Sequence, residues 1–243
     1  MQAHWQAFLC ALQFLTLIPV RLAGMPDQAT QARAFLYYPL VGLLLGGLLL
    51  GLVWLTQGVP VAVQATLVLV LWCGVTGGLH LDGLADSADG WMGGLGDRER
   101  TLRIMKDPHL GGTGALVLML QLLLKWSLLQ ALLAESMWLP ILLAPLVGRS
   151  AVQFLLLGTP YARPGGIAQG LQQLSRLPIL VCGVMLAVLL LWLHPLVPVM
   201  VMVTFWGLRL LMQRRLQGYT GDTAGAVIEL QESVVLITAL VVL

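Results

Sequence analysis

The chain has 243 residues, of which 58% are hydrophobic and only 10% are charged. Soluble domains are about 45 to 50% apolar, so this composition, with a mean hydropathy of +0.89, predicts an integral membrane protein. The net charge is +2 and the thirteen Lys and Arg residues are scattered, which argues against a basic face that would bind nucleic acid.

Apolar runs recur along the chain, and a helix needs about 20 mostly apolar residues to cross a bilayer. Residues 5–20 form a shorter run that either crosses obliquely or lies at the interface, and residues 233–243 are too short for a comfortable span. We expect an all-α, polytopic bundle of about six to eight membrane helices that forms a single domain, 1–243. The six clear runs are 34–56, 61–79, 114–134, 137–157, 178–193 and 195–212.

The stretch LHLDGLADSADGWMGG, residues 79–94, concentrates carboxylates in a chain that has few of them. Asp82, Asp86 and Asp89 are spaced i, i+4, i+7, which places them on one stripe of a helix. Like charges so close together repel, and hard oxygen ligands suit Mg²⁺ or Mn²⁺ held with substrate phosphates. The stretch therefore predicts metal-assisted phosphate chemistry. The alternative is a solvated Asp- and Gly-rich loop, and two glycines, at 83 and 90, argue against an uninterrupted helix.

Residues around this stretch offer further contacts for a substrate. His80 either assists proton transfer and ligand orientation or is an interfacial side chain. Lys106, Asp107 and His109 precede LGGTG, residues 110–114, where a helix N-terminus either holds a phosphate or merely follows a Gly-rich turn. We interpret three arginines here as a solvated face: Arg98, Arg100 and Arg103.

Two arginines in the middle of the chain differ in how strongly their positions require a binding partner. Arg149 lies inside an apolar run, where an ionised side chain is costly unless it faces the bundle interior and finds a partner. It suits binding of phosphate or pairing with an aspartate, and snorkelling to the interface is the alternative. Arg163, in TPYARPGG, lies in a connection and needs less explanation. Lys125 and Glu135 are interpreted as ordinary anchors that flank a membrane helix.

A second polar group follows in GYTGDTAGAVIELQE, residues 218–232. Asp222, Glu229 and Glu232 are spaced i, i+7, i+10, so a helix would align them beside the first acidic cluster. A helix N-cap is the alternative interpretation of Asp222 or of Thr223.

The connections between the predicted membrane helices alternate in charge. Cytoplasmic loops collect Lys and Arg, so the basic connections are predicted to face the cytoplasm together with the acidic stretch. The connections at 57–60, 135–136 and 194 carry no Lys or Arg, whereas the basic ones are 21–33, 80–113, 158–177 and 213–231.

Three separated segments, TGGLHLDGLADSADG, RTLRIMKDPHLGGTGAL and GYTGDTAGAVIELQE, together resemble the cobalamin synthase family, the adenosylcobinamide-GDP ribazoletransferases. The likeness extends to FLTLIPV, YYPLVGLLLG, GRSA and YAR, so it covers essentially the whole chain. The sequence departs from the family pattern at Pro108 and His109, where the family has Ser-Arg, and at Gln217, where it has Gly.

This resemblance implies a multi-pass enzyme of the bacterial inner membrane, surrounded by lipid, that requires Mg²⁺ and has its active site at the cytoplasmic side. Its substrates would be adenosylcobinamide-GDP and α-ribazole or its 5'-phosphate, with release of GMP. Whether copies associate into a homo-oligomer is left open.

Residues in three roles are expected to form the site. The predicted metal ligands are Asp82, Asp86, Asp89 and Asp107. The predicted catalytic residues are Asp82, Asp86, Asp89 and Lys106, and the predicted substrate-binding residues are His80, His109, Arg149, Arg163, Thr220, Asp222 and Glu229.

Two other functions compete with this prediction. DSADG, residues 86–90, resembles the start of the CDP-alcohol phosphotransferase signature, although Gly93 and Gly94 stand where that signature has Ala-Arg. An ion-coupled transporter is a third class, but transport sites usually lie near the bilayer midplane, whereas these acids lie at predicted cytoplasmic helix ends.

Overall fold

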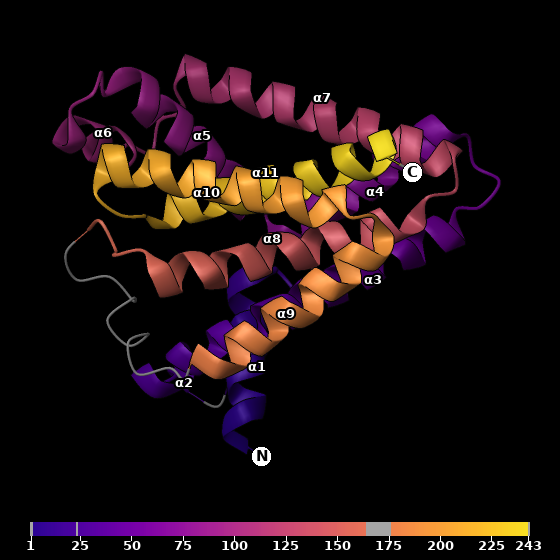
Figure 1. Ribbon diagram of the computed structural model, residues 1–243, viewed down its shortest axis with the longest axis horizontal. Helices are drawn as coiled ribbons and strands as arrows, with labels where there is room; N and C mark the ends of the chain where they lie inside the picture. The colour runs from indigo at the N-terminus through magenta and orange to yellow at the C-terminus, as the bar shows by residue number, and fades with distance from the viewer. Residues whose placement is uncertain (1, 23, 164–175, 243) are drawn as a thin grey trace.

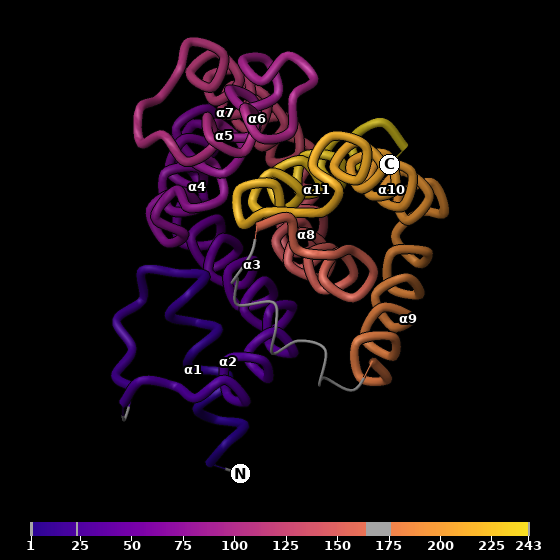
Figure 2. Tube along the Cα trace, turned by 90° about the vertical axis from the view of Figure 1, so that its left-hand side faces the viewer, coloured from indigo at the N-terminus to yellow at the C-terminus, as the bar shows by residue number. Residues whose placement is uncertain are grey.

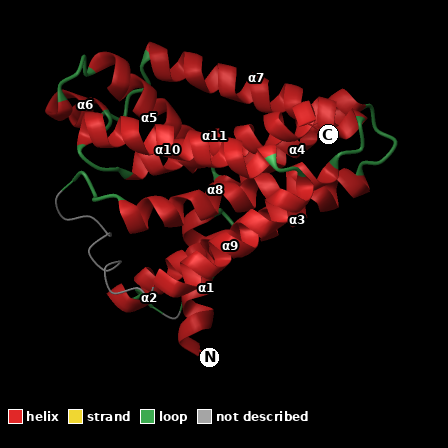
Figure 3. Cartoon of the chain, viewed as in Figure 1, coloured by secondary structure: helices red, strands yellow, loops and turns green. Residues whose placement is uncertain are grey.

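A computed structural model describes residues 2–22, 24–163 and 176–242. Over these residues the chain is helical, and its β-structure is limited to an isolated bridge between Tyr161 and Tyr219 (Figures 1 and 3). The helices are α1 (Gln2–Leu15), α2 (Gln28–Ala34), the short 3-10 helix η1 (Phe35–Tyr37), α3 (Tyr38–Leu55), α4 (Val61–Thr76), α5 (Leu79–Gly93), α6 (Arg98–Ile104), α7 (Gly112–Ala134), α8 (Trp138–Gly158), α9 (Arg176–Leu193), α10 (Leu196–Leu216) and α11 (Gly221–Val242).

Six segments of the described chain are long and apolar enough to cross a membrane: Gln28–Leu55, which joins α2 to α3, and the helices α7, α8, α9, α10 and α11. They confirm the predicted polytopic helical bundle. The predicted short run near the start forms α1, which has 14 residues and is not one of these segments.

α4 and α5 are joined by a sharp bend and are long and apolar enough to cross a membrane only as a pair. Their axes differ by 84°. The bend lies at Gly77 and Gly78, whose φ angles of 61° and 68° are in the left-handed region that favours glycine. The apolar run predicted to end at residue 79 therefore stops at Thr76, and α5 carries the aspartates in a new direction.

The prediction of a short last segment was wrong. α11 begins at Gly221 and has 22 residues, because the polar residues in its first half belong to the helix rather than to a connection. Glu229 and Glu232 are buried against neighbouring helices, so they do not face lipid. In the end view α11 lies near the middle of the bundle, with α5 and α7 on one side and α8 on the other (Figure 2).

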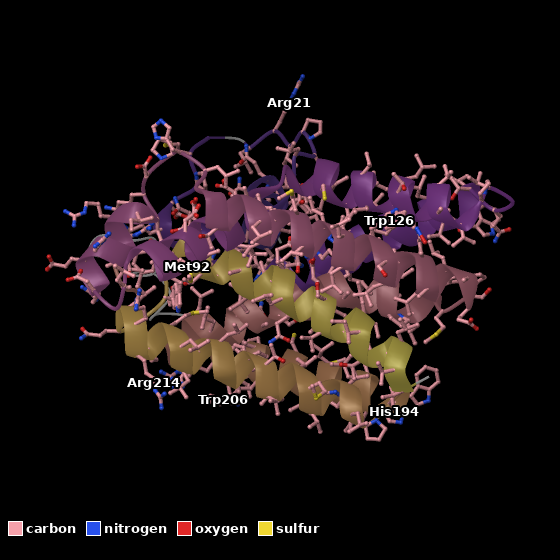
Figure 4. The ribbon with its side chains drawn as sticks, turned by 90° about the horizontal axis from the view of Figure 1, so that it is seen from above. Arg21, Met92, Trp126, His194, Trp206 and Arg214 are labelled. Atoms are coloured by element: carbon pink, nitrogen blue, oxygen red, sulfur yellow. The ribbon has the colours of Figure 1, made fainter. Side chains whose placement is uncertain are left out.

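The two ends of the bundle differ in charge, as the alternation of connections predicts. The end that holds α6 and the turn between α10 and α11 carries arginines such as Arg214, while His194 lies at the opposite end (Figure 4). The connections at that opposite end join α3 to α4, α7 to α8 and α9 to α10, and they contain no Lys or Arg.

Candidate functional site

The aspartate stretch is an uninterrupted helix, so the expectation that its glycines would break it was wrong. Both glycines are points of close contact. A Cβ at Gly83 would lie 2.7 Å from the backbone oxygen of Asp222, and one at Gly90 would collide with Met105. The cost of glycine in a helix is offset here because it lets α5 cross α11 closely. The first and second polar groups are thereby brought together.

Carboxylates from both helices share one corner of the molecule. Asp82 is exposed and Asp86 is half-buried on α5, and Asp222 is half-buried in the first turn of α11. The charges of Asp82 and Asp222 both act on Asp86, and the nearby Arg163 opposes them. We call this set of Asp82, Asp86 and Asp222 the acidic corner. Such a set of carboxylates attracts a cation.

Asp89 is already engaged, although it belongs to the same stripe. Its two carboxylate oxygens accept hydrogen bonds from the backbone N–H groups of Gly111 and Gly114, each at 2.8 Å. A Cβ on either glycine would collide with this carboxylate. The N-terminus of α7 therefore binds an aspartate of the protein at the turn where a bound phosphate was one of two alternatives. Gly111 and Gly114 are needed for that contact.

The start of α11 is held by a reciprocal cap and an ion pair. The Thr220 backbone N–H donates to Thr223 Oγ1 at 2.8 Å, and the Thr223 N–H donates to Thr220 Oγ1 at 3.2 Å. Asp222 is thus not the cap. It accepts a hydrogen bond from Arg163 Nη2 at 2.7 Å. Thr220 is buried and also donates to Asp222, at 3.2 Å.

The donor chemistry of this corner suits Mg²⁺. Within the described chain no three Asp, Glu, His or Cys side chains stand close enough to hold a metal ion by themselves. Mg²⁺ does not need such a cage, because it commonly takes one or two carboxylates and completes its shell with water and substrate phosphates. Asp82 and Asp86 can supply those carboxylates, and the structure shows neither of them in a hydrogen bond to another described side chain.

A basic groove lies next to the acids. It has a volume of about 460 Å³ and is lined by Arg98, Arg103, Lys106 and Arg163 together with Glu99, Leu102 and Ala162. Arg98 is structural here, because it donates to the backbone oxygens of Leu216 and Ala162, both at 2.8 Å. Arg103 and Lys106 are exposed. Arg163 belongs to the groove and also binds Asp222, so the groove and the acidic corner are contiguous.

Asp107 and His109 form a pair of their own in the exposed turn between α6 and α7. His109 Nδ1 lies 2.6 Å from Asp107 Oδ1. Hydrogen bonds from the His109 ring and backbone N–H lower the pKa of Asp107 below its ordinary value. No hydrogen bond in the described chain joins this pair to the aspartates of α5.

A buried charge cluster occupies the interior between α7, α8 and α11. Lys125 Nζ contacts Glu229 Oε2 at 2.6 Å and Glu232 Oε2 at 2.5 Å, and Arg149 Nη1 binds the other oxygen of Glu232. Two cations thus face two anions. Glu229 and Arg149, which were predicted to bind substrate, have their charged groups directed at this cluster.

His80 connects the buried charge cluster to the acidic corner. Its Nδ1 lies 3.3 Å from Arg149 Nη2. A guanidinium can only donate, so Nδ1 is the acceptor and the ring proton resides on Nε2. His80 is buried, and it is one of the residues that line a cavity shared with Asp82 and Asp222.

The interpretation of Lys125 as an ordinary anchor was wrong. Lys125 lies in the middle of α7, is 2% exposed and stands 4.5 Å from the ring centroid of Trp72, so it is not an anchor at a helix end. The available signal was its position near the middle of a mostly apolar run, where a lysine requires a buried partner.

The chain matches a family profile described as cobalamin-5-phosphate synthase over residues 7–240. A relative from Pseudomonas syringae pv. syringae (strain B728a) is 51% identical over 238 residues, covering 95% of this chain and 97% of the relative. A Pseudomonas fluorescens relative (strain ATCC BAA-477 / NRRL B-23932 / Pf-5) is 49% identical over 239 residues, with the same coverage. Both are named adenosylcobinamide-GDP ribazoletransferase. No solved structure matches the chain. A match along almost the whole length, through all three motifs that form the acidic corner, shows that the chain belongs to the cobalamin-5-phosphate synthase family.

Proposed function

We propose that this protein is an adenosylcobinamide-GDP ribazoletransferase that carries out a late step of cobalamin biosynthesis. The observation that carries the proposal is the meeting of three distant motifs at one end of the bundle. Asp82 and Asp86 come from α5, Asp222 from α11, and Lys106 from the segment after α6. Relatives that are about half identical over 95% of the chain bear that enzyme's name.

In the proposed reaction, a ribose hydroxyl of α-ribazole attacks the phosphorus that carries the cobinamide. A new P–O bond forms to the ribose oxygen, and the bond from that phosphorus to the bridging oxygen of the pyrophosphate breaks. GMP leaves with the bridging oxygen, and the hydroxyl proton passes to a base on the enzyme. The products are adenosylcobalamin and GMP, or adenosylcobalamin 5'-phosphate when the nucleoside carries a 5'-phosphate.

Mg²⁺, held by Asp82 and Asp86, would offset the charge of the pyrophosphate and polarise the phosphorus that is attacked. Residues of the protein neutralise the phosphate oxygens and accept the proton. Arg163 and Lys106 neutralise phosphate oxygens at the edge of the basic groove. Because Asp89 and Asp222 are engaged with Gly111, Gly114 and Arg163, the base that accepts the proton is Asp82 or Asp86.

In this proposal the residues of the buried charge cluster position the site residues without contacting the substrate. Arg149 fixes the tautomer and position of His80, whose Nε2–H can donate to a substrate oxygen in the adjacent cavity. Glu229 and Lys125 hold α11 against α7. His109 and Asp107 are too exposed to be fixed in place, and we assign them at most a contact that forms with substrate bound.

We further propose that the protein lies in the bacterial inner membrane with the acidic corner at the cytoplasmic face. The arginines of α6 and of the last turn of α10, such as Arg214, lie at that end of the bundle. This orientation would place the acidic corner where cytoplasmic nucleotides are available. The match of the family profile over residues 7–240 favours this enzyme over a CDP-alcohol phosphotransferase or an ion-coupled transporter.

The test is Mg²⁺-dependent GMP release from adenosylcobinamide-GDP by the purified protein in detergent or lipid nanodiscs. We expect release only when both α-ribazole and Mg²⁺ are present. Release without the nucleoside would indicate a hydrolase, and no release under any condition would contradict the proposal.

A further inference from the structure

A cavity with aromatic walls opens directly onto the acidic corner. Its volume is about 460 Å³, within the range of about 300 to 1,000 Å³ that is typical of small-molecule sites. It lies among α1, α2, α3, α5, α8 and α11. The rings that line it are Phe14, Phe35, Tyr38, Tyr161 and Tyr219, and we call it the aromatic cavity.

The rings come in two groups that are already packed for stacking. Phe35 and Tyr38 have centroids 4.8 Å apart, and Phe14 stacks on Tyr38 at 6.1 Å with an interplanar angle of 16°. Tyr161 and Tyr219 meet edge to face at 5.2 Å, on the two segments joined by the isolated bridge. Rigid aromatic walls of this kind bind flat aromatic ligands through stacking.

Few polar groups line the aromatic cavity. They include His80, Asp82 and Asp222, which face the cavity from α5 and α11. A ligand with a flat apolar part and a hydroxylated part would therefore place the apolar part among the rings and its hydroxyls toward the carboxylates. This mainly apolar, aromatic lining with a few polar groups matches an aromatic nucleoside whose base has few hydrogen-bonding groups.

We infer that the aromatic cavity is the binding site for the incoming nucleoside, with the substituted benzimidazole of ribazole among the rings and its ribose facing Asp82. This inference rests on the proposed function and deepens it. The guanosine diphosphate end of the other substrate then takes the basic groove, because its phosphates need the cations that the aromatic cavity lacks. Arg163 and Asp222, bound to each other, separate the two sites.

The corrin ring takes neither site. It is much larger than either space, and it must reach the pyrophosphate from outside the bundle. Because the two substrates occupy separate sites, changes in the aromatic cavity should alter the apparent affinity for the nucleoside only.

Two adjacent leucines on α8 provide a matched test. Leu156 lines the aromatic cavity, whereas Leu157 lines a different apolar cleft between α8, α9 and α10. Both side chains are half-buried. Leu156→Trp would fill part of the aromatic cavity, and Leu157→Trp places the same bulk on the same helix, facing away from it.

Steady-state GMP release is measured for both variants and for the unaltered protein while each substrate is varied in turn. For Leu156→Trp we expect the KM for α-ribazole to rise at least tenfold, while the KM for adenosylcobinamide-GDP stays within about twofold. Leu157→Trp leaves both values unchanged. A rise in the KM for adenosylcobinamide-GDP alone would assign the aromatic cavity to the corrinoid substrate, and unchanged values would show that neither substrate binds in it; either result overturns the inference.

A second variant keeps the test decisive if Leu156→Trp does not fold. Phe14 is 55% exposed on α1, so Phe14→Ala removes a stacking surface with little loss of buried core. We expect a several-fold rise in the KM for α-ribazole alone, and no rise would contradict the inference. If the unaltered protein itself releases no GMP on addition of α-ribazole, the proposed function fails rather than the assignment of the aromatic cavity.

Discussion

The aspartates on one stripe of α5 differ in their contacts, although the sequence spaces them regularly. Asp89 gives both carboxylate oxygens to backbone N–H groups of α7. Asp82, in the first turn of α5, is exposed and lines the aromatic cavity. Residues of the same type and the same period are therefore divided between a structural contact inside the protein and an exposed position at the cavity. Substitution at each should change different measured quantities.

Asp82→Asn is expected to lower kcat for GMP release by about 10²- to 10⁴-fold, because it removes a carboxylate that we propose as a metal ligand or as the general base. The thermal midpoint should stay unchanged, since Asp82 is exposed. Glu135→Gln, at the opposite end of the bundle, is the matched control and should behave like the unaltered protein. Normal kcat in folded Asp82→Asn protein would show that Asp82 is dispensable.

Asp89→Asn is expected to act mainly on stability. The amide keeps one acceptor oxygen but turns an N–H₂ group toward a backbone donor, and loss of such a contact at a helix N-terminus costs about 1 to 2 kcal/mol. A lower thermal midpoint in detergent, with activity that falls only as folded protein is lost, is the expected result. A kcat loss as large as that of Asp82→Asn at unchanged thermal midpoint would instead place Asp89 at the metal.

The sequence revealed the residue types of the site better than their partners. The spacing of the three aspartates and the unusual position of Arg149 are visible in the sequence, because each breaks an apolar pattern. The partner of Asp89 is not visible, since it is a pair of backbone N–H groups more than twenty positions away. Backbone donors carry no sequence signal apart from the glycines that let the carboxylate approach.

At the scale of elements, the crossing of α5 and α11 decides whether the two acidic groups meet. Gly83→Ala is expected to lower activity at least tenfold, because its Cβ would lie 2.7 Å from the Asp222 backbone oxygen and push the helices apart. Gly47→Ala on α3 is the control, since nothing lies within 4 Å of a Cβ there and alanine is the better helix former. GMP release at saturating substrate measures both, and equal activities would contradict the role of this crossing.

The buried charge cluster joins three helices, and its balance can be tested by a double-mutant cycle. Lys125→Met leaves two glutamates facing only Arg149, and breaking a buried ion pair in this way costs about 3 to 5 kcal/mol. Adding Glu229→Gln restores the balance of one cation to one anion, so we expect the double variant to regain much of the lost thermal stability. Additive losses in thermal midpoint would show that the two residues do not act as a pair.

The element that the sequence reasoning misjudged is α11, and the reason is physical. Hydropathy measures a segment as if lipid surrounded it, but the polar half of α11 is surrounded by α5, α7 and α8. The span was therefore shortened to its apolar half. Helices such as α9, which is largely exposed on the outside of the bundle, follow the hydropathy rule closely.

At the scale of the whole molecule, the charge of the connections was predictable because it depends on counts of Lys and Arg rather than on packing. The orientation can be measured with single cysteines in a protein whose own Cys10, Cys73 and Cys182 are replaced by serine. In intact cells, a membrane-impermeant maleimide should label Glu135→Cys, and should label Glu99→Cys only after the membrane is made permeable. The reverse pattern would invert the proposed orientation.

The buried charge cluster also has a consequence for how the protein is made. Lys125 and Arg149 enter the membrane with α7 and α8, whereas the glutamates that neutralise them arrive later, on α11. Until then the growing chain holds two cations without these carboxylates in its apolar interior. A chain that stops before residue 221 would keep that defect permanently, so synthesis of α11 and electrical neutrality of the core become the same event.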